Sequence, residues 1–270
     1  MPLLRKLRHQ VAKSSARTPL VWMRHKSLKA TDAFFASYPR SGSTWIRFLL
    51  FDSLVGEPSA FNTVNHAIPD VKLHKHGLPL LPDGGRLIKT HEVFHPEYRK
   101  AVYLVRDPRD VALSEFAYQT ALGLEDADLD AYLRKFVSRS VNPFSSWRDH
   151  VDSWLSAPLS SDQLMTVRFE DVRADPVKLL MQIVAFLGVT PDEARIRAAV
   201  ANNTVEKMKI KEKATPQRAS KNGQFIRSGS SGGWRKNMKP EQVKIFSGVS
   251  EAMARLGYSL EAEPVEAVTA

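Results

Sequence analysis

The chain has 270 residues, 43% of them hydrophobic, and no cysteine, which excludes disulfides, thiolate metal sites and a cysteine nucleophile. Its formal net charge of +10 favours anionic partners such as nucleic acid, phosphorylated cofactors, acidic lipids or acidic glycans. The length suits one α/β domain or two small ones. We expect a single domain over residues 32–258, with tails at 1–31 and 259–270, and neither a signal peptide nor a membrane-spanning segment.

The N-terminal tail is the most basic part of the sequence. Residues 1–31 contain eight Lys and Arg and no acidic residue, since the first carboxylate is Asp32. Apolar side chains recur at helical spacing among the cations: Leu3, Leu4, Leu7 and Val11. A solvated tail is one interpretation, and a basic amphipathic helix resting on an anionic membrane is the other. We expect a cytoplasmic protein. Under the second interpretation, the N-terminal helix would make peripheral contact with the inner face of the membrane.

Strand and helix patterns alternate along the rest of the chain. Apolar runs predict four buried strands, at residues 32–38, 86–90, 101–105 and 164–169. Helical periodicity and caps predict helices over 43–55, 108–123, 126–137, 143–155, 175–188, 191–200, 204–212 and 240–256. Residues 57–85 and 215–237 are expected to be irregular. This alternation indicates an α/β fold, with a mostly parallel sheet covered on both faces and ligands at the carboxyl ends of its strands.

The loop after the first strand, "YPRSGSTW" at 38–45, has the composition of an anion site. Small residues let the backbone and the following helix N-terminus approach an anion: Ser41, Gly42, Ser43 and Thr44. Arg40 adds charge, and Trp45 offers a flat face for a purine. The loop is not a Walker A motif, because Ser43 rather than lysine follows Gly42. Taken alone, it equally fits an ordinary βα turn.

Two further basic stretches follow. In "VRDPRDVALS", Arg106 ends the third strand and Ser114 lies two helical turns further on. In "RSGSSGGWRK", Arg227, Ser228 and Gly229 open a flexible basic loop, which suits either a solvated linker or a lid over an anion.

Taken together, these three stretches resemble the sulfotransferase family that uses 3′-phosphoadenosine 5′-phosphosulfate (PAPS). Their order and spacing agree with the family from residue 33 to about 256. The sequence, notably "SYPRSGSTWIRFLL" at 37–50, is most similar to bacterial members. The resemblance implies a P-loop-NTPase-like fold, PAPS as sulfuryl donor, PAP as product and no metal. It implies a hydroxyl-bearing acceptor, which is a small molecule, glycan or lipid, and no nucleic-acid partner.

The resemblance also implies roles for matching positions. The 5′-phosphosulfate would be held by Arg40, Ser41, Gly42, Ser43 and Thr44. Trp45 would stack on adenine, and Thr204 would lie near the nucleotide. The 3′-phosphate would be bound by Arg106, Ser114, Arg227, Ser228 and Gly229. Lys89 and His91, in "KTH", fall on the family's catalytic pair, and no metal ligand is implied.

Taken without the neighbouring loops, His91 fits a satisfied polar residue at a strand end better than a catalytic one. Together with those loops, the residues of "KTH" suit this chemistry. Lys89 and His91 are two apart, so in a strand they project from the same face. A neutral histidine suits general-base chemistry, while Lys89 and Arg40 would stabilise charge on the leaving group.

The same stretch also contains His91, Glu92 and His95 in the H-E-x-x-H pattern of zinc proteases. That alternative needs a helix, whereas a strand precedes His91 and Pro96 disfavours helical geometry at His95. We therefore interpret Glu92 and His95 as rim or surface residues.

Three departures from the family pattern stand out. Arg40 replaces a lysine, Ser228 replaces a second cation, and Phe169 replaces a tyrosine. No dimer motif is recognisable, which leaves the oligomeric state open. The acceptor is also unidentified, and we expect residues 57–85 and 117–146 to line its site. A P-loop-type nucleotide or sugar kinase and a non-enzymatic nucleic-acid or membrane-binding protein are the alternative functions.

Overall fold

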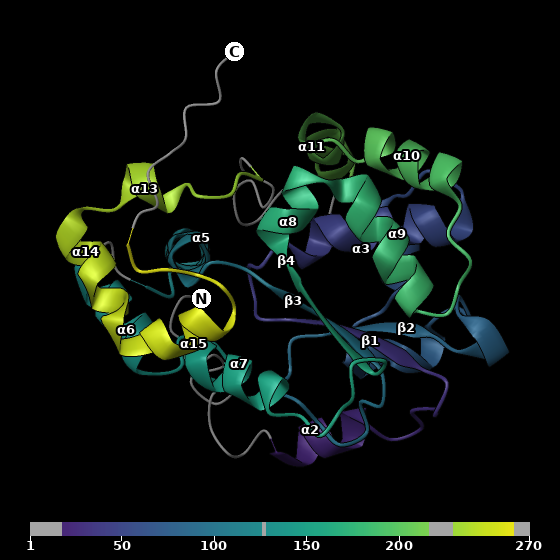
Figure 1. Cartoon of the computed structure of the whole chain (residues 1–270), viewed down its shortest axis with the longest axis horizontal. Helices are drawn as coiled ribbons and strands as arrows, with labels where there is room; N and C mark the ends of the chain where they lie inside the picture. The colour runs from purple at the N-terminus through teal and green to yellow at the C-terminus, as the bar shows by residue number, and fades with distance from the viewer. Residues whose placement is uncertain (1–17, 126–127, 216–228, 262–270) are drawn as a thin grey trace.

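A single parallel sheet forms the centre of the computed structural model, which describes residues 18–125, 128–215 and 229–261 (Figure 1). Its four strands lie in the order β2-β1-β3-β4. They are β1 (Ala33–Ser37), β2 (Leu87–Thr90), β3 (Ala101–Val105) and β4 (Leu164–Arg168). All neighbouring strands pair in parallel, as predicted. The chain passes from β1 to β2 on one side and then crosses to β3 on the other, so a ligand crevice is expected beyond the end of β1.

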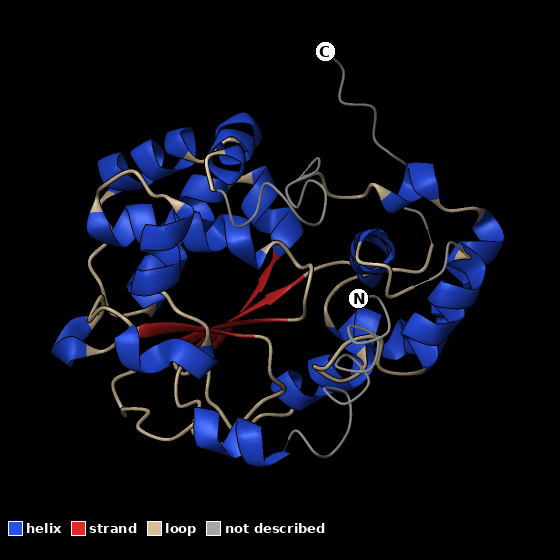
Figure 2. Ribbon diagram, turned by 180° about the vertical axis from the view of Figure 1, so that it is seen from behind, coloured by secondary structure: helices blue, strands red, loops and turns tan. Residues whose placement is uncertain are grey.

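Both faces of the sheet are buried, because successive strand residues alternate between two cores. Phe35 and Val102 belong to one core, and Phe34 and Tyr103 belong to the other. The first core is covered by α3 (Ser43–Val55), α4 (Phe61–Ala67), α9 (Pro176–Phe186) and α10 (Glu193–Asn202). The second is covered by α5 (Pro108–Ala121), α6 (Leu129–Ser138), α7 (Trp147–Leu155) and α15 (Ser250–Arg255). Figures 1 and 2 show these two helical layers on opposite sides of the strands.

Several predicted helices differ at their ends. The helix expected over 143–155 begins only at Trp147, where the Ser146 side chain accepts a hydrogen bond from Asp149 N and caps it. The helix expected over 240–256 is divided into α14 (Pro240–Lys244), the 3₁₀ turn η4 (Ile245–Val249) and α15. Within the loop expected at 215–237, the structure has the short helix α13 (Trp234–Asn237). The remaining α-helices of the described residues are α2 (Thr18–Arg24), α8 (Phe169–Ala174) and α11 (Val205–Lys213).

The prediction that residues 57–85 are irregular is partly wrong. This stretch contains helix α4 and the 3₁₀ turns η2 (Val71–His76) and η3 (Pro82–Gly84). The sequence of α4, FNTVNHA, has weak helix formers, so local propensity does not reveal it. Packing supplies the stabilisation instead: the Phe61 ring meets Phe48 of α3 edge-on, with centroids 4.7 Å apart.

Candidate active site

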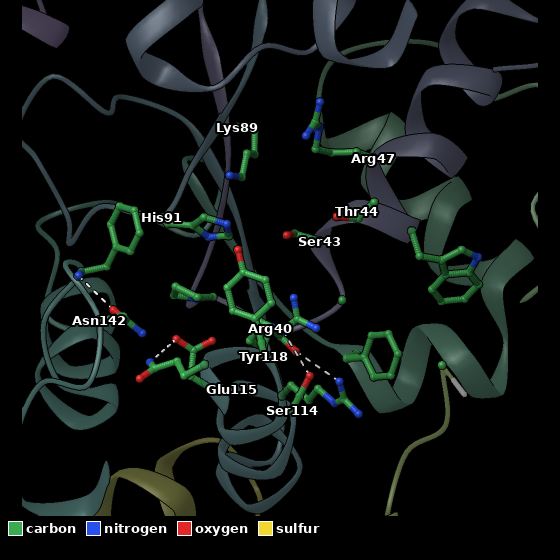
Figure 3. Close-up of a pocket in the computed structure, with 18 of the residues that line it drawn as sticks. Arg40, Ser43, Thr44, Arg47, Lys89, His91, Ser114, Glu115, Tyr118 and Asn142 are labelled. Carbon is green, nitrogen blue, oxygen red and sulfur yellow. Dashed lines mark hydrogen bonds between the residues drawn. The ribbon is translucent and has the colours of Figure 1, made fainter. Parts of the chain in front are cut away.

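A cavity of about 490 Å³ lies at the carboxyl ends of the four strands. Each strand contributes to its wall through the residues that follow it, with Arg40 after β1, His91 after β2, Arg106 after β3 and Phe169 after β4. Figure 3 shows Lys89 and His91 facing Ser43 and Thr44 across this cavity, with Arg40, Ser114 and Tyr118 beside them. The structure therefore brings together the β1–α3 loop, the "KTH" pair and the β3–α5 stretch.

The backbone of the β1–α3 loop has a conformation that lets an anion approach it closely. Arg40 adopts φ 69° and Gly42 φ 91°, both in the left-handed region. A Cβ on Gly42 would lie 2.4 Å from the Phe169 ring, so only glycine fits there. Helix α3 begins at Ser43 without a side-chain cap, which leaves its first backbone N–H groups without intrahelical acceptors. Such an N-terminus is suited to an anion.

Contacts with other residues of the cavity fix the side chains of Arg40 and Arg106. Arg40 Nε donates to Ser114 Oγ at 3.2 Å, and the Arg40 guanidinium stacks over Tyr118 at 4.7 Å. Arg106 Nη1 donates to the Arg40 carbonyl at 3.1 Å, and its guanidinium lies 4.7 Å from the centre of the Phe169 ring. The predicted cofactor residues Arg40, Arg106 and Ser114 are thus one connected group. Phe169, which stands where a tyrosine is common in the family, provides this ring and closes the space over Gly42.

The C-terminal basic loop approaches the same place. Arg106 Nη2 donates to the Ser230 carbonyl at 2.9 Å. Asp110 accepts from the backbone N–H groups of Gly232 at 2.7 Å and Trp234 at 2.9 Å, which ties the loop to α5. Gly229 lines the cavity. The other two lid residues of the prediction, Arg227 and Ser228, lie outside the described residues.

Trp45 is held by a buried polar network that sequence reasoning missed. Its indole Nε1 donates to the Asn203 carbonyl at 2.8 Å. The Asn203 side chain donates to Asp52 at 2.6 Å and accepts from Lys211 Nζ at 2.7 Å. Burial raises the pKa of Asp52 and lowers that of Lys211. The network fixes the orientation of the ring that was predicted to stack on adenine.

Thr204 has a different place from the other predicted residues. It is the N-cap of α11, where its Oγ1 accepts a hydrogen bond from Lys207 N at 3.3 Å. Its side chain is exposed, and the α11 residues that line the cavity are Val205 and Met208. The structure therefore gives Thr204 a capping contact next to the cavity rather than in its wall.

Lys89 is paired with a residue that the sequence did not single out. Its Nζ donates to Asp70 Oδ2 at 3.1 Å, and its backbone N–H donates to Pro69 O at 2.8 Å, so this segment continues the edge of the sheet beside β2. Burial lowers the pKa of Lys89 to about 8, and the Asp70 carboxylate partly opposes that shift. Asp70 therefore favours the protonated form of Lys89.

A hydrogen bond fixes which ring nitrogen of neutral His91 carries the proton. Its Nδ1 lies 2.6 Å from the Ser37 carbonyl, which can only accept, so Nδ1 carries the proton and Nε2 carries the lone pair. Burial, aided by the charge of Lys89, lowers the pKa of His91 well below its usual value. His150 supports this loop by donating from Nε2 to the His91 carbonyl at 3.2 Å. Burial lowers the pKa of His150 to about 3, so it is neutral too.

The rest of the zinc-protease pattern has no part in the cavity. Residues 91–95 are not helical, so His91 and His95 do not share a helix face. His95 stacks on His25, with centroids 4.0 Å apart. The prediction that Glu92 is a rim or surface residue is wrong: it is buried and pairs with Arg24 at 3.3 Å. Among the described residues, no group of three or more His, Asp or Glu is arranged to hold a metal ion.

The part of the cavity wall formed by residues 115–124 and 142–144 is more apolar. It includes Tyr118, Leu122, Leu124, Pro143 and Phe144, together with the buried polar residues Glu115, Gln119 and Asn142. It adjoins the "KTH" pair, because the Phe144 ring meets the His91 ring edge-on with centroids 5.5 Å apart. The residues of this part lie within 117–146, which was predicted to line the acceptor site, except for Glu115. None of the described cavity-lining residues comes from 57–85, the other segment in that prediction. Residues of that segment contact side chains of the cavity wall from behind: Asp70 pairs with Lys89, and Asn65 accepts a hydrogen bond from Arg47 at 2.9 Å.

Comparison with known proteins agrees with this architecture. The family model of the sulfotransferase domain matches residues 30–257. Human Sulfotransferase 2B1 is 28% identical over 82% of this chain, and the match spans 65% of that protein's length. Rat Sulfotransferase 2A6 is 26% identical, with 84% of this chain and 86% of the relative covered.

Solved structures share the same fold. Mouse sulfotransferase SULT7A1 in complex with PAP superposes with a TM-score of 0.69 at 24% identity, over 89% of this chain and 90% of that one. Retinol dehydratase in complex with androsterone and PAP has a TM-score of 0.64 at 22% identity, over 88% of this chain and 84% of that one. The chain belongs to the sulfotransferase domain family, and it is an enzyme of that kind.

Proposed function

From its membership of the sulfotransferase family, we propose that this protein transfers the sulfuryl group of PAPS to a hydroxyl acceptor and releases PAP. One observation carries the proposal: the Lys89 and His91 side chains line the same cavity as the uncapped start of α3 and the arginines Arg40 and Arg106. A base, a buried cation and an anion-binding loop thus converge on one space. The presence of PAP in SULT7A1 and retinol dehydratase supports PAPS as the donor.

The donor would lie along the loops at the strand ends. The 5′-phosphosulfate would bind at residues 40–44, where Arg40 and the α3 N-terminus supply positive charge. Arg106 and Ser114 would bind the 3′-phosphate, with the loop at Gly229 closing over it. Trp45, oriented by the Asn203 carbonyl, would stack on adenine. No metal is required, because these groups supply the charge that phosphosulfate binding needs.

The chemistry requires one proton to move and one bond to be exchanged. The acceptor oxygen attacks sulfur as the bond from sulfur to the 5′-phosphate oxygen breaks, and the acceptor proton passes to His91 Nε2. The Nδ1–H bond to Ser37 keeps Nε2 available for that proton. Lys89 and Arg40 stabilise the charge that develops on the leaving phosphate oxygen. Asp70 holds Lys89 in its charged form and orients its ammonium group.

The acceptor would enter from the end lined by Tyr118, Leu124 and Phe144. The mixture of apolar side chains with Gln119 and Asn142 suits an acceptor that has an apolar body and few polar groups. Retinol dehydratase is seen with androsterone in one structure and with retinol in another, which supports a small-molecule acceptor.

The test is a transfer assay with PAPS and a panel of phenols, aliphatic alcohols, glycans and lipid alcohols, read by product mass. We expect a mass gain of one sulfuryl group on at least one class, stoichiometric PAP, and no requirement for Mg²⁺. Phosphate transfer from Mg²⁺–ATP, with no sulfated product from PAPS, would contradict the proposal in favour of a kinase.

A further inference from the structure

A cluster of exposed apolar side chains lies away from the cavity, where α2 meets η2. Trp22 and Met23 of α2 are 61% and 55% exposed, and Leu73 of η2 is 53% exposed. Met23 and Leu73 line the same shallow depression between the two elements. We call these three residues the anchor patch. Large apolar side chains that are this exposed and adjacent mark an interaction surface.

The anchor patch is preformed, because buried contacts hold its two elements together. His74 of η2 lies within hydrogen-bond distance of the Lys26 carbonyl, with Nε2 at 3.0 Å. Arg86, paired with Asp32, donates to the His74 carbonyl at 2.9 Å and to the Ser27 carbonyl at 3.2 Å. The relative position of Met23 and Leu73 is therefore fixed by the start of β2, and binding would not require them to be ordered first.

Positive charge surrounds the anchor patch. Residues 18–31 and 71–78 contain five Lys and Arg and no acidic residue. Lys26, Lys29, Lys72 and Lys75 are exposed, and Lys26 Nζ lies 4.3 Å from the centre of the Trp22 ring. The preceding residues 1–17 add five more Lys and Arg and no acidic residue to the sequence.

We propose that the anchor patch and its lysines bind the surface of an anionic membrane. Each Lys or Arg near such a surface contributes about 1 kcal/mol, and Trp is suited to the headgroup level. Apolar side chains next to cations fit a lipid surface better than nucleic acid, which would use the charge but leave Trp22, Met23 and Leu73 in water. In the described ranges, no helix is long and apolar enough to cross a membrane.

The test is flotation of the full chain with vesicles of phosphatidylcholine alone or with a quarter phosphatidylglycerol. We expect at least tenfold more protein on the anionic vesicles, and loss of most of it between about 0.1 M and about 0.5 M salt, because screening shortens the range of the attraction. Equal binding to both kinds of vesicle would overturn the charge component. Tighter binding to duplex DNA than to anionic vesicles would replace the membrane by nucleic acid.

Matched variants locate the surface. Trp22→Ser with Met23→Ser and Leu73→Ser should reduce flotation at least fivefold, whereas Ile210→Ser should not, although Ile210 is 66% exposed among the lysines of α11. Equal effects of both variants would remove the anchor patch from the interaction.

A charge control separates the patch from net charge. Lys26→Glu, Lys29→Glu and Lys75→Glu together should abolish binding. The triple change Lys178→Glu, Lys213→Glu and Lys244→Glu alters the net charge equally at other exposed lysines, and should leave most of the binding. If both triple variants lose binding equally, the net charge alone is responsible and the patch proposal fails. Sulfotransfer to a water-soluble acceptor should be unchanged in all these variants, which keeps this test separate from that of the proposed function.

Discussion

At the donor end of the cavity, the charged contacts come from loops that directly follow strands, whereas the acceptor end is built by side chains from the C-terminal half of α5, from the residues just after it and from residues 142–144. The donor end is polar and tightly bonded, with Arg40, Arg106 and Ser114 joined to one another. The acceptor end is mainly apolar. Under the proposed function, the difference indicates that donor binding would be specified by short contiguous motifs, and acceptor choice by side chains dispersed along the chain. The following variants separate the two ends.

The largest effect is expected at the junction of the two ends. His91→Ala should lower kcat by about 10²- to 10⁴-fold, because the base that accepts the acceptor proton is removed. PAP affinity, measured by calorimetry, should change little. His95→Ala is the matched control from the same five-residue stretch, and it should retain near-normal turnover. Near-normal kcat for His91→Ala would remove His91 from the reaction.

A change confined to the donor end comes next. Arg106→Ala should weaken PAP binding by roughly 10- to 100-fold, the value of a charged hydrogen bond, while AMP binding changes much less. Arg197→Ala, on the exposed face of α10, serves as the control. An equal loss for PAP and AMP would mean that Arg106 supports the loop through the Arg40 carbonyl and does not read the 3′-phosphate.

A change confined to the acceptor end should weaken acceptor binding and leave PAP binding unchanged. Leu124→Ala removes apolar surface from the far wall of the cavity and should raise the acceptor KM by roughly tenfold or less. The Kd for PAP should stay constant, since Leu124 comes after α5 and belongs to none of the loops at the strand ends. A parallel rise in both constants would show that the two ends are not separable.

The smallest effect at neutral pH is expected for Asp70→Asn, and it grows with pH. In the proposed mechanism Lys89 acts in its charged form, so kcat/KM should fall as pH rises through about 8 in the wild type. Asp70 raises the pKa of Lys89, so its neutralisation should move this alkaline limb to lower pH. The acid limb, set by His91, should lie below pH 6.5 in both proteins, because the pKa of His91 is lowered. Asp162→Asn, at an exposed loop, should leave the profile unchanged, and an unmoved limb in Asp70→Asn would exclude the proposed role.

The positions of the strands along the chain and the residues at their ends could be predicted from sequence, because apolar runs and small or basic residues stand next to each other along the chain. The four parallel strands were predicted correctly. Lys89, His91 and Arg106 line one cavity, and the roles assigned to them stay predictions. Asp70 and Asn203 could not be predicted as parts of the site. Each reaches it through tertiary contacts to residues far along the chain, Lys89 and Trp45. Helix α4 was missed for a related reason, since packing and not propensity stabilises it.

The measurement that tests the central claim most directly is calorimetric titration of the wild-type protein with PAP and with AMP, which lacks only the 3′-phosphate. We predict that PAP binds at least tenfold more tightly, without added metal, and that the difference shrinks as salt is raised, because Arg106 reads that phosphate partly through charge. Equal affinity for the two nucleotides, or binding that requires Mg²⁺, would contradict the assignment of this cavity to a 3′-phosphorylated sulfuryl donor.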